Sequence, residues 1–503
     1  MTIAEEIAPI VHWVDGKRWD GTGDRTVPVF DPATGATTAM VRLASADDVA
    51  TAVASARAAA GEWGRSSLAR RTQVLFALRE VVHARRADLA AVITAQHGKV
   101  TADALGEVAR GLEVVEYACG IPAALQGGHS HQVSTDVDVH SLRQPLGVVA
   151  GITPFNFPAM VPMWMFPMAI ACGNAFVLKP SERDPGASLL LAEMAADAGL
   201  PEGVLTVVQG DAEAVDALLD HADVAAVSFV GSTRVARHVY ERGAAAGKRV
   251  QALGGAKNHM GVLPDADLAA AADAAVSAAY GSAGERCMAV SVLVAVDPVG
   301  DDLVARVRDR IAGLTIAPGT TPGADMGPLV TAAHRDRVAG LVAAGVDDGA
   351  DLVVDGRGLV VAGHEGGFFL GPCLFDHVRS DMTVYREEIF GPVLAVVRAD
   401  SYEEALDLVA ANPYGNGVAV FTRDGGAARR FAAEAEAGMV GVNVPIPVPM
   451  AYFSFGGWGD SLFGDTHAYG PESVHFYTRG KVVTTRWADP VTRGPDLGFP
   501  THT

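Results

Sequence analysis

The stretch Val224-Ala-Ala-Val-Ser-Phe-Val-Gly-Ser-Thr-Arg-Val-Ala236 places an apolar strand-type run directly before a Gly-Ser-Thr turn and the start of a helix. A glycine at such a turn lets the backbone approach a phosphate group, and the helix N-terminus together with Ser232 supplies hydrogen-bond donors. The full GxGxxG pattern is missing, so an ordinary capped helix explains the same residues equally well. The stretch therefore predicts a strand–turn–helix unit and leaves its ligand open.

The same alternation extends over residues 146–254. The apolar strand-type runs are Leu146–Ile152, Ala175–Leu178, Val204–Val208 and Val224–Val230, and the helical segments between them include Ser188–Ala198 and Ala212–Leu219. Continuous apolar strands that alternate with helices are typical of a parallel sheet covered on both faces. A second alternating block runs from about Val262 to Val440, so the sequence predicts an α/β protein.

Segments that flank the first block predict further elements. An Asp-Gly turn indicates a hairpin over His12–Trp19, and helical periodicity runs over Ser45–His97 and Thr101–Glu116. Two segments far apart in the chain, Val133–Leu142 and Val474–Trp487, have the character of extended strands. We expect these two strands to pair into a small satellite sheet.

Composition and charge exclude several classes of protein. The chain has 503 residues, 49% of them hydrophobic, and a formal net charge of −20, which argues against a nucleic-acid partner because such proteins present a basic face. Its four cysteines form no CxxC pair, which argues against a disulfide scaffold or a zinc ribbon and fits a cytoplasmic location. The 15 histidines show no HExxH spacing, so no metal site is predicted.

No segment predicts export or insertion into a membrane. The residues from Gln144 to Leu178 are uncharged and long enough to span a bilayer, but prolines interrupt them repeatedly. We expect this stretch to form buried strand, loop and helix that line a site. The acidic start Met1–Glu6 lacks the positive charge of a signal peptide, and the Pro- and Gly-rich tail 488–503 is expected to be loosely ordered.

Cys287 is the candidate nucleophile. It lies in the run Tyr280-Gly-Ser-Ala-Gly-Glu-Arg-Cys-Met-Ala289, and a lone cysteine in a Gly-rich segment suggests a thiol that forms a covalent acyl intermediate. The upstream segment Ala252–His259 contains no carboxylate, which suggests that water does not resolve that intermediate. The other three cysteines, at positions 119, 172 and 373, are expected to be small core residues.

Three further motifs carry polar or aromatic side chains that suit a ligand site. Asn156 can donate a hydrogen bond to a developing oxyanion in a dry site. Lys179 and Glu182 come at the end of a predicted strand and can bind ligand hydroxyls. Glu388 can hold a ribose while Phe390 packs on a flat ring. Taken singly, these residues are better explained by a buried turn at Asn156, a solvated loop at Lys179 and Glu182, and a helix end beside a core phenylalanine at Glu388 and Phe390.

Together, in this order and spacing, the motifs resemble the NAD(P)-dependent aldehyde dehydrogenase superfamily from about Val11 to Trp487. The resemblance implies an α/β aldehyde dehydrogenase fold with a Rossmann-like NAD domain, an α/β catalytic domain and a small β oligomerisation arm. The expected ranges are 1–127 and 146–254 for the NAD domain, 255–442 for the catalytic domain, 128–145 and 472–490 for the oligomerisation strands, 443–471 for an active-site linker, and 491–503 for a flexible tail.

The resemblance also implies roles for individual residues. Cys287 becomes the nucleophile, and Asn156 forms an oxyanion hole with the backbone N–H of Cys287. The residues implied for NAD binding are Thr153, Phe155, Lys179, Glu182, Arg183, Ser232, Glu388 and Phe390. The carboxylate of Glu182 favours NAD over NADP, because it would repel a 2′-phosphate.

One position departs from the pattern of the family members that release a free acid. Those members resemble Glu-Leu-Gly-Gly-Lys-Asn before the nucleophile, where the glutamate activates water, whereas the best match to that glutamate here is Leu253. A leucine cannot act as a general base. A thioester on Cys287 is therefore expected to await a stronger nucleophile, and the thiol of coenzyme A fits.

Three segments are similar to the methylmalonate-semialdehyde dehydrogenase branch of the family, namely Gly255–His259, Arg286–Ala289 and Asn443–Pro449. That branch implies a semialdehyde carboxylate as substrate, coenzyme A as co-substrate, and loss of the carboxylate. Arg110 and Arg286 are the implied carboxylate clamp, since a guanidinium binds a carboxylate through two parallel hydrogen bonds. The alternatives are a surface ion pair of Arg110 with Glu107 or Glu113, and a structural hydrogen bond from Arg286.

Two other functions stay open at this point. One is a hydrolytic NAD-dependent aldehyde dehydrogenase with an unrecognised base, and the other is an inactive paralogue that serves as a scaffold. The resemblance implies a homo-oligomer, either a dimer or a tetramer, without nucleic-acid or membrane partners. The sequence does not identify the base that activates coenzyme A.

Overall fold

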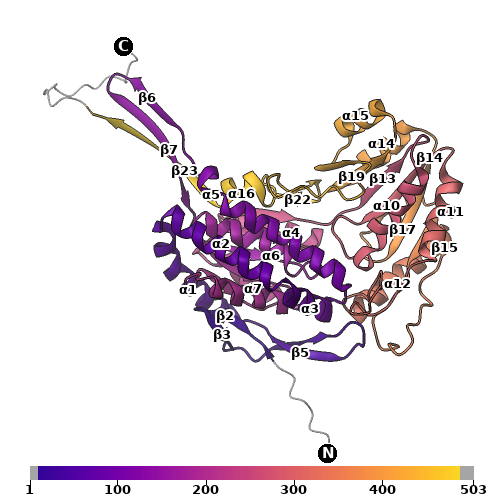
Figure 1. The fold of residues 1–503 in the computed structure, drawn as a ribbon, viewed down its shortest axis with the longest axis horizontal. Coiled ribbons are helices and arrows are strands. Elements are labelled where there is room, and N and C mark those ends of the chain that lie inside the picture. The colour runs from indigo at the N-terminus through magenta and orange to yellow at the C-terminus, as the bar shows by residue number, and fades with distance from the viewer. Residues whose placement is uncertain (1–8, 488–503) are drawn as a thin grey trace, which may run out of the picture.

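The computed structural model describes residues 9–487. Within them the chain forms two large sheets, each covered by helices, and a narrow three-stranded arm that projects from the first half of the molecule (Figure 1). The acidic start Met1–Glu6 and the predicted tail 488–503 lie outside the described residues.

The first large sheet has eight strands in the order β22-β12-β11-β8-β9-β10-β2-β3. The strands are β2 (His12–Val14), β3 (Lys17–Trp19), β8 (Val148–Ile152), β9 (Ala175–Lys179), β10 (Leu205–Val207), β11 (Val224–Val230), β12 (Arg249–Leu253) and β22 (Leu462–Phe463). The five strands from β12 to β10 are parallel, which confirms the predicted βαβ block. The predicted hairpin is also confirmed, since β2 pairs with β3 in antiparallel register.

Helices bury both faces of this sheet, and each face has its own hydrophobic core. One face carries α1 (Ala46–Arg65), α8 (Ala212–Asp220) and α9 (Thr233–Ala245). The other face carries α2 (Leu68–Ala84), α3 (Arg86–His97), α4 (Thr101–Cys119), α6 (Met160–Ala171) and α7 (Gly186–Asp197), with the short α5 (Ile121–Ala124) after α4. The predicted helical stretch before α4 is divided in three, because Ser67 caps a new helix and Arg85 leaves the helical conformation.

The uncharged stretch from Gln144 to Leu178 forms β8, α6 and β9, as predicted. Every residue of α6 is buried, so its apolar sides all face protein. Among residues 9–487, no helix combines the length and the apolar character that a membrane crossing requires.

The second large sheet has seven strands in the order β15-β16-β17-β14-β13-β19-β20, and all but β15 are parallel to their neighbours. The strands are β13 (Asn258–Val262), β14 (Val290–Val296), β15 (Asp351–Val354), β16 (Cys373–Asp376), β17 (Val393–Ala399), β19 (Gly417–Phe421) and β20 (Met439–Val442). Its helices are α10 (Leu268–Tyr280), α11 (Gly300–Ile311), α12 (Ala332–Asp347), α13 (Thr383–Arg386), α14 (Tyr402–Ala410) and α15 (Gly425–Glu434). The predicted second block of alternating strands and helices is therefore confirmed.

The arm consists of β6 (His129–Ser134), β7 (Val137–Pro145) and β23 (Thr478–Arg486). The predicted pairing of two distant segments is confirmed, because β23 pairs with β7 along its whole length. Two details of the prediction were wrong. The segment Val133–Leu142 is a hairpin rather than one strand, since Asp136 adopts a left-handed conformation with φ 61°. Residues 474–476 belong to α16 (Gly470–Phe476), where Val474 and Phe476 pack into the core on a helix instead of along an edge strand.

Smaller elements complete the described chain. A three-stranded sheet contains β1 (Pro9–Ile10), β4 (Thr26–Phe30) and β5 (Thr37–Arg42), a two-stranded one contains β18 (Tyr414–Gly415) and β21 (Trp458–Gly459), and the 3₁₀ turn η1 spans Gly281–Gly284. Cys119, Cys172 and Cys373 are buried, as predicted, whereas Cys287 is partly accessible.

Candidate active site

The order of the first sheet reverses at β8, which is flanked by β9 on one side and by β11 on the other. In parallel α/β sheets a ligand crevice opens at this reversal, outside the carboxyl ends of the strands. Thr153, Phe155 and Asn156 follow β8, Lys179 ends β9, and Ser232 follows β11. The fold therefore brings five predicted site residues to the same edge of the sheet.

Ser232 is the N-cap residue of α9, but its side chain makes no capping hydrogen bond within the described chain. The hydroxyl of Thr233 accepts a hydrogen bond from the N–H of Gly255 over 2.9 Å, which ties the helix start to the segment after β12. The N–H groups of the first helical turn have no partners within the helix, and together they favour an anion. This end of α9 can receive a phosphate group.

Lys179 and Glu182 interact with each other at this edge. The ammonium of Lys179 is buried and lies 3.4 Å from a carboxylate oxygen of Glu182, whose side chain is 36% exposed. Burial lowers the pKa of Lys179, while Glu182 opposes that shift. The long contact leaves the remaining N–H groups of this ammonium available for ligand hydroxyls.

Aromatic rings connect the first sheet to the second. The rings of Phe155 and Phe390 meet edge to face with centroids 5.8 Å apart, and the guanidinium of Arg183 lies 4.8 Å above the ring of Phe155. Phe390 has a φ of 57°, and its carbonyl accepts a hydrogen bond from Nε2 of His334 over 2.7 Å. A left-handed phenylalanine costs conformational energy, so this bond helps to hold a strained residue in place.

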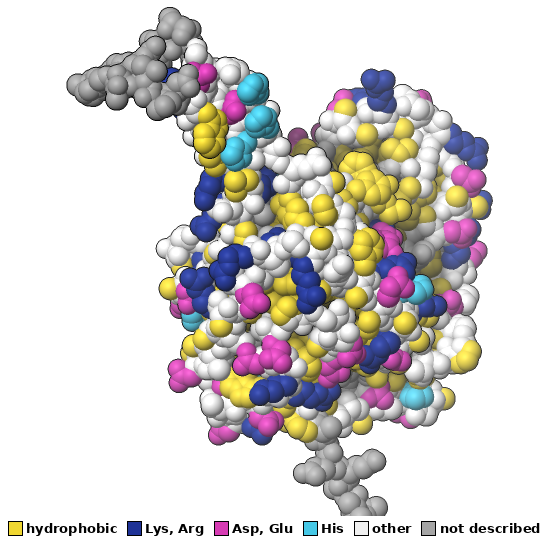
Figure 2. All heavy atoms as spheres, turned by 60° about the vertical axis from the view of Figure 1, so that its left-hand side comes forward, with side chains coloured by type: hydrophobic (Ala, Val, Ile, Leu, Met, Phe, Trp, Pro, Cys, Tyr) yellow, Lys and Arg dark blue, Asp and Glu magenta, His cyan; other side chains and the backbone are white. Residues whose placement is uncertain are grey.

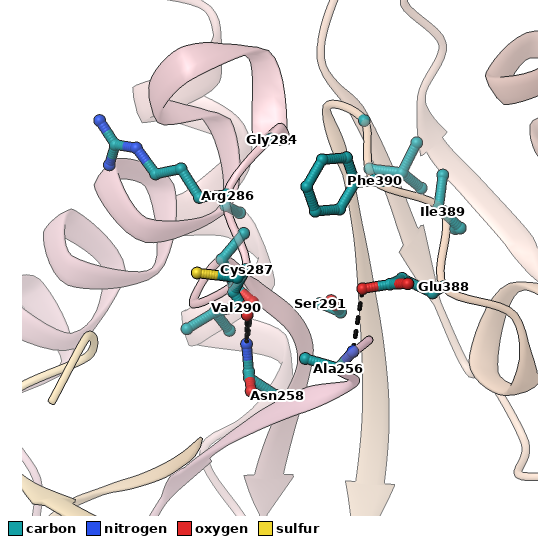
Figure 3. A pocket seen from close by; sticks show the side chains of 14 residues that line it. Ala256, Asn258, Gly284, Arg286, Cys287, Val290, Ser291, Glu388, Ile389 and Phe390 are labelled. Atoms are coloured by element: carbon teal, nitrogen blue, oxygen red, sulfur yellow. Dashed lines mark hydrogen bonds between the residues drawn. The ribbon is translucent and has the colours of Figure 1, made fainter. Parts of the chain in front are cut away.

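Cys287 lies between η1 and β14 and lines a small pocket with Glu388 and Phe390 (Figure 3). The turn before it is unusual, because Ser282, Ala283 and Gly284 all have positive φ values. At Gly284 a side chain would force the backbone to shift, since a Cβ would lie 2.1 Å from the carbonyl oxygen of Gly391. The turn therefore fixes the direction in which the chain enters Cys287.

Two amides hold the peptide of Cys287. Its carbonyl accepts hydrogen bonds from Nδ2 of Asn258 over 2.9 Å and from Nδ2 of Asn416 over 3.1 Å. Asn258 also donates to the carbonyl of Ala289 and accepts from the N–H of Gly417. The sequence alone does not reveal the role of either asparagine, and nothing in the local pattern links Asn416 to a residue 129 positions away.

Burial and the nearby carboxylate of Glu388 raise the pKa of the Cys287 thiol to about 12. Glu388 itself accepts a hydrogen bond from the N–H of Ala256 over 2.9 Å, and burial raises its pKa. A pKa so far above neutral means that the thiol is mostly protonated at pH 7. A change in the charge or hydration of the pocket has to accompany its conversion to the reactive thiolate.

Asn156 is buried and contacts the segment that carries the cysteine. Its Nδ2 donates to the carbonyl of Glu285 over 3.0 Å, two residues before Cys287. Its own backbone carbonyl accepts a hydrogen bond from Nζ of Lys99 over 2.6 Å. The structure thus brings the predicted oxyanion donor to the loop of the predicted nucleophile.

The two arginines are paired with carboxylates of α4. Arg286 donates to Asp103 over 2.7 Å, and its side chain extends away from Glu388 in Figure 3. Arg110 donates to Glu113 over 2.6 Å and to the carbonyl of Pro449 over 2.9 Å. Asp103 and Arg110 lie two turns apart on α4, or about 10 Å along its axis. Of the two alternatives for Arg110, the ion pair with Glu113 forms, whereas Glu107 binds Lys99.

Leu253 is the last residue of β12 and is buried in a hydrophobic core against the first sheet. It lies opposite Leu462 of the neighbouring strand β22. A side chain at the next residue would require the backbone to shift, because a Cβ on Gly254 would lie 2.6 Å from the carbonyl oxygen of Asp460. The backbone N–H of Gly254 also donates to the carbonyl of Ser461. At this position the chain therefore presents packed hydrocarbon where hydrolytic relatives were expected to carry a base.

Glu285 is a third residue whose role the sequence alone does not reveal. Its carboxyl group is fully buried, 3.6 Å from His97 Nε2 and 3.5 Å from His334 Nε2, and it accepts the N–H of Val330 over 3.3 Å. Burial raises the pKa of Glu285 to about 8 and lowers that of both histidines. The three side chains are therefore neutral at pH 7.

We expect Glu285→Gln to stabilise the protein, and to do so more strongly as the pH rises. In the native state Glu285 keeps its proton up to about pH 8, whereas an unfolded chain loses it near pH 4.5. The native state thus binds more protons between these values, and the wild-type free energy of unfolding falls across that window. The glutamine amide resembles a neutral carboxyl group but cannot ionise, so the free energy of unfolding of the variant does not fall in this way.

The measurement is the melting temperature of wild type and variant from pH 5 to pH 8.5. The difference should be small at pH 5 and grow toward pH 8. Glu62→Gln, at an exposed position on α1, serves as the control and should show no such trend. A constant offset at every pH would mean that Glu285 is ionised in the native state.

Comparison with known proteins agrees with this geometry. Residues 19–483 match the aldehyde dehydrogenase family. A malonate-semialdehyde dehydrogenase of Pseudomonas aeruginosa is 56% identical over 477 residues, covering 95% of this chain and 96% of that protein. A relative from Halalkalibacterium halodurans with the same name is 46% identical over 476 residues, covering 95% of this chain and 98% of that protein.

Solved structures agree as well. The methylmalonate-semialdehyde dehydrogenase of Oceanimonas doudoroffii superposes with a TM-score of 0.95 at 51% identity, covering 96% of this chain and 99% of that chain. A candidate methylmalonate-semialdehyde dehydrogenase of Sinorhizobium meliloti in complex with NAD gives 0.96 at 51% identity, covering 97% and 99%. The chain therefore belongs to the aldehyde dehydrogenase family and is an oxidoreductase that acts on aldehydes.

Proposed function

We propose that this enzyme oxidises malonate semialdehyde or methylmalonate semialdehyde with NAD and transfers the acyl group to coenzyme A. The carboxylate of the substrate is lost as carbon dioxide or bicarbonate, so the products are acetyl- or propionyl-coenzyme A. The names of the relatives support the substrate class. The observation that carries the coenzyme A step is the buried Leu253, which replaces the water-activating base.

The residues at the crevice fit NAD. The start of α9 with Ser232 suits the pyrophosphate, and Lys179 with Glu388 suits ribose hydroxyls. The buried hydroxyl of Thr153 has no hydrogen-bond partner among the described residues, as expected of a group that a ligand satisfies. When bound, NAD supplies the acceptor for the hydride of the aldehyde carbon.

The enzyme's own groups carry out the remaining chemistry. Arg110 and Arg286 hold the substrate carboxylate through charge-assisted hydrogen bonds. The thiolate of Cys287 adds to the aldehyde carbon, and Asn156 with the N–H of Cys287 stabilises the alkoxide that forms. Loss of the hydride turns this adduct into a thioester.

Decarboxylation and acyl transfer follow from the thioester. The bond to the carboxylate breaks, its electron pair moves into the thioester carbonyl as an enolate, and a proton then adds at the α-carbon. The thiol of coenzyme A next attacks the carbonyl and releases Cys287. Leu253 carries no group that could activate water, so the intermediate persists until coenzyme A arrives.

The decisive experiment mixes enzyme, NAD and malonate semialdehyde, with and without coenzyme A, and follows NADH. We expect one equivalent of NADH per active site in a rapid burst, then a slow rate that coenzyme A accelerates by about 100-fold or more. Acetyl-coenzyme A should accumulate in proportion to NADH. A steady rate that coenzyme A does not change, with free acid as product, would overturn the proposal in favour of hydrolysis.

We also propose that residues 1–127 and 146–254 form the NAD domain and that residues 255–442 form the catalytic domain. We further propose that the enzyme is a homo-oligomer, a dimer or a tetramer, assembled through the arm. The strands β6 and β23 are the edges of the arm, and Val482 on β23 is 68% exposed. Figure 2 shows that the arm projects from the body of the molecule and carries hydrophobic side chains on one side. Exposed strand edges of this length favour pairing with a second chain. The four free cysteines favour a cytoplasmic location.

A further inference from the structure

A buried ion pair lies directly beneath the loop that carries Asn156. Lys99 follows the end of α3, and Glu107 lies on α4. Their charged groups are 2.8 Å apart, and neither side chain has any exposed surface. None of the proposed chemical steps uses this pair.

The other contacts of both side chains fall on one short segment, residues 156–160. Nζ of Lys99 donates to the carbonyl of Asn156 over 2.6 Å and lies 4.3 Å from the centre of the Phe157 ring. The second oxygen of Glu107 accepts the N–H groups of Ala159 over 2.9 Å and Met160 over 3.1 Å. The two charges therefore hold the segment at both of its ends.

Glu107 also replaces a missing helix cap. The N-cap residue of α6 is Ala159, which has no side chain that could accept the first N–H groups of the helix. The carboxylate of Glu107 accepts two of them and places a negative charge at the positive end of the helix dipole. The start of α6, and with it the turn after Asn156, is thus fixed from a different helix.

Stability gives a poor explanation of this arrangement. A buried ion pair loses so much hydration that an apolar pair of similar volume is often equally stable or more so. The distinctive property of the pair is geometric, since it fixes the backbone of Asn156 while the carbonyl of Glu285 fixes the side-chain amide. Both restraints act on the group that would face the developing oxyanion.

We infer that Lys99 and Glu107 are positioning residues, which hold the amide of Asn156 in the orientation that stabilises the oxyanion formed on attack by Cys287. This inference rests on the proposed role of Asn156. It predicts that the pair matters for the acylation step and not for the binding of NAD. An amide displaced by a fraction of an ångström would lose most of its effect on the transition state.

The test is a double-mutant cycle with three variants, Lys99→Met/Glu107→Gln, Asn156→Ala, and the combination of all three. The first variant removes both charges together, so that no unpaired buried charge remains. The readouts are the rate constant of the NADH burst, the dissociation constant of NAD and the melting temperature. The burst is followed with propanal as well as malonate semialdehyde, so that an error in the proposed substrate affects only the second series.

We expect Lys99→Met/Glu107→Gln to slow the burst by about 10- to 100-fold, and Asn156→Ala to slow it by about 100- to 1,000-fold. Adding the paired change to Asn156→Ala should slow the burst no further, because the pair acts through that amide. The dissociation constant of NAD should stay within about twofold of wild type. A merely structural pair would instead change the melting temperature and slow the burst equally in both backgrounds.

The matched control is Asp376→Asn/Arg398→Met, which removes a largely buried ion pair of the second sheet without touching the site. It should leave the burst unchanged, whatever its effect on the melting temperature. If Lys99→Met/Glu107→Gln does not fold, Lys99→Gln/Glu107→Gln likewise leaves no unpaired buried charge and should give a loss that again vanishes with Asn156→Ala. An unchanged burst in the paired variant overturns the inference. An unchanged burst in Asn156→Ala overturns the proposed oxyanion role and the inference with it.

Discussion

Cys287→Ala should lower NADH formation from any aldehyde by at least about 10⁴-fold, the largest effect that we expect from a single change. Removing the nucleophile of a covalent mechanism leaves only the binding contribution of the site. The other three thiols of the chain are buried elsewhere, so none can replace it. Because none of the proposed NAD contacts uses the thiol, the binding of NAD should persist in the variant.

The measurement compares NADH formation and NAD binding in wild type, Cys287→Ala and the control Cys119→Ala. The control removes a buried thiol at the end of α4 and should retain activity. Alkylation of wild-type Cys287 by iodoacetamide should be slow at pH 7 and accelerate as the pH rises toward the pKa of about 12. Turnover of Cys287→Ala within tenfold of wild type would refute a covalent thioester.

Arg110→Ala/Arg286→Ala should lower kcat/KM for malonate semialdehyde by about 100- to 1,000-fold while changing that for propanal little. A hydrogen bond to a charged group is worth about 1.5–3 kcal/mol, and the variant removes such bonds from both arginines. It also leaves Asp103 and Glu113 without their cations, so their negative charges repel an anionic substrate. Propanal has no carboxylate and escapes both effects.

The control is Arg79→Ala, which removes a partly exposed ion pair with Glu116 on the same helix α4. It should leave both aldehydes unaffected. An equal loss for propanal and the semialdehyde would assign Arg110 and Arg286 a purely structural role, through the contacts with Asp103, Glu113 and Pro449. A loss confined to the semialdehyde would support the clamp.

The predictions that depended on local pattern succeeded. The apolar runs predicted strands β8 to β11, and the uncharged stretch predicted the buried helix α6. The motifs around Cys287 and Asn156 predicted the family and the fold. Such features are visible in sequence because strand and helix periodicity are properties of neighbouring residues. Where the local pattern was ambiguous the prediction was wrong. Val474 was predicted to lie in a strand, but it packs into the core on a helix.

The sequence by itself determined the fold family, the nucleophile candidate and the lack of a base at Leu253. Only the tertiary structure decided how the site is supported. Lys99 and Glu107 hydrogen-bond to the loop of Asn156, and the amide of Asn416 donates to the carbonyl of Cys287. The neutral carboxyl group of Glu285 lies between two histidines. These contacts join elements that are distant in the chain. Their formation depends on how sheets and helices pack, and the pKa of a carboxyl group depends on the burial that this packing imposes.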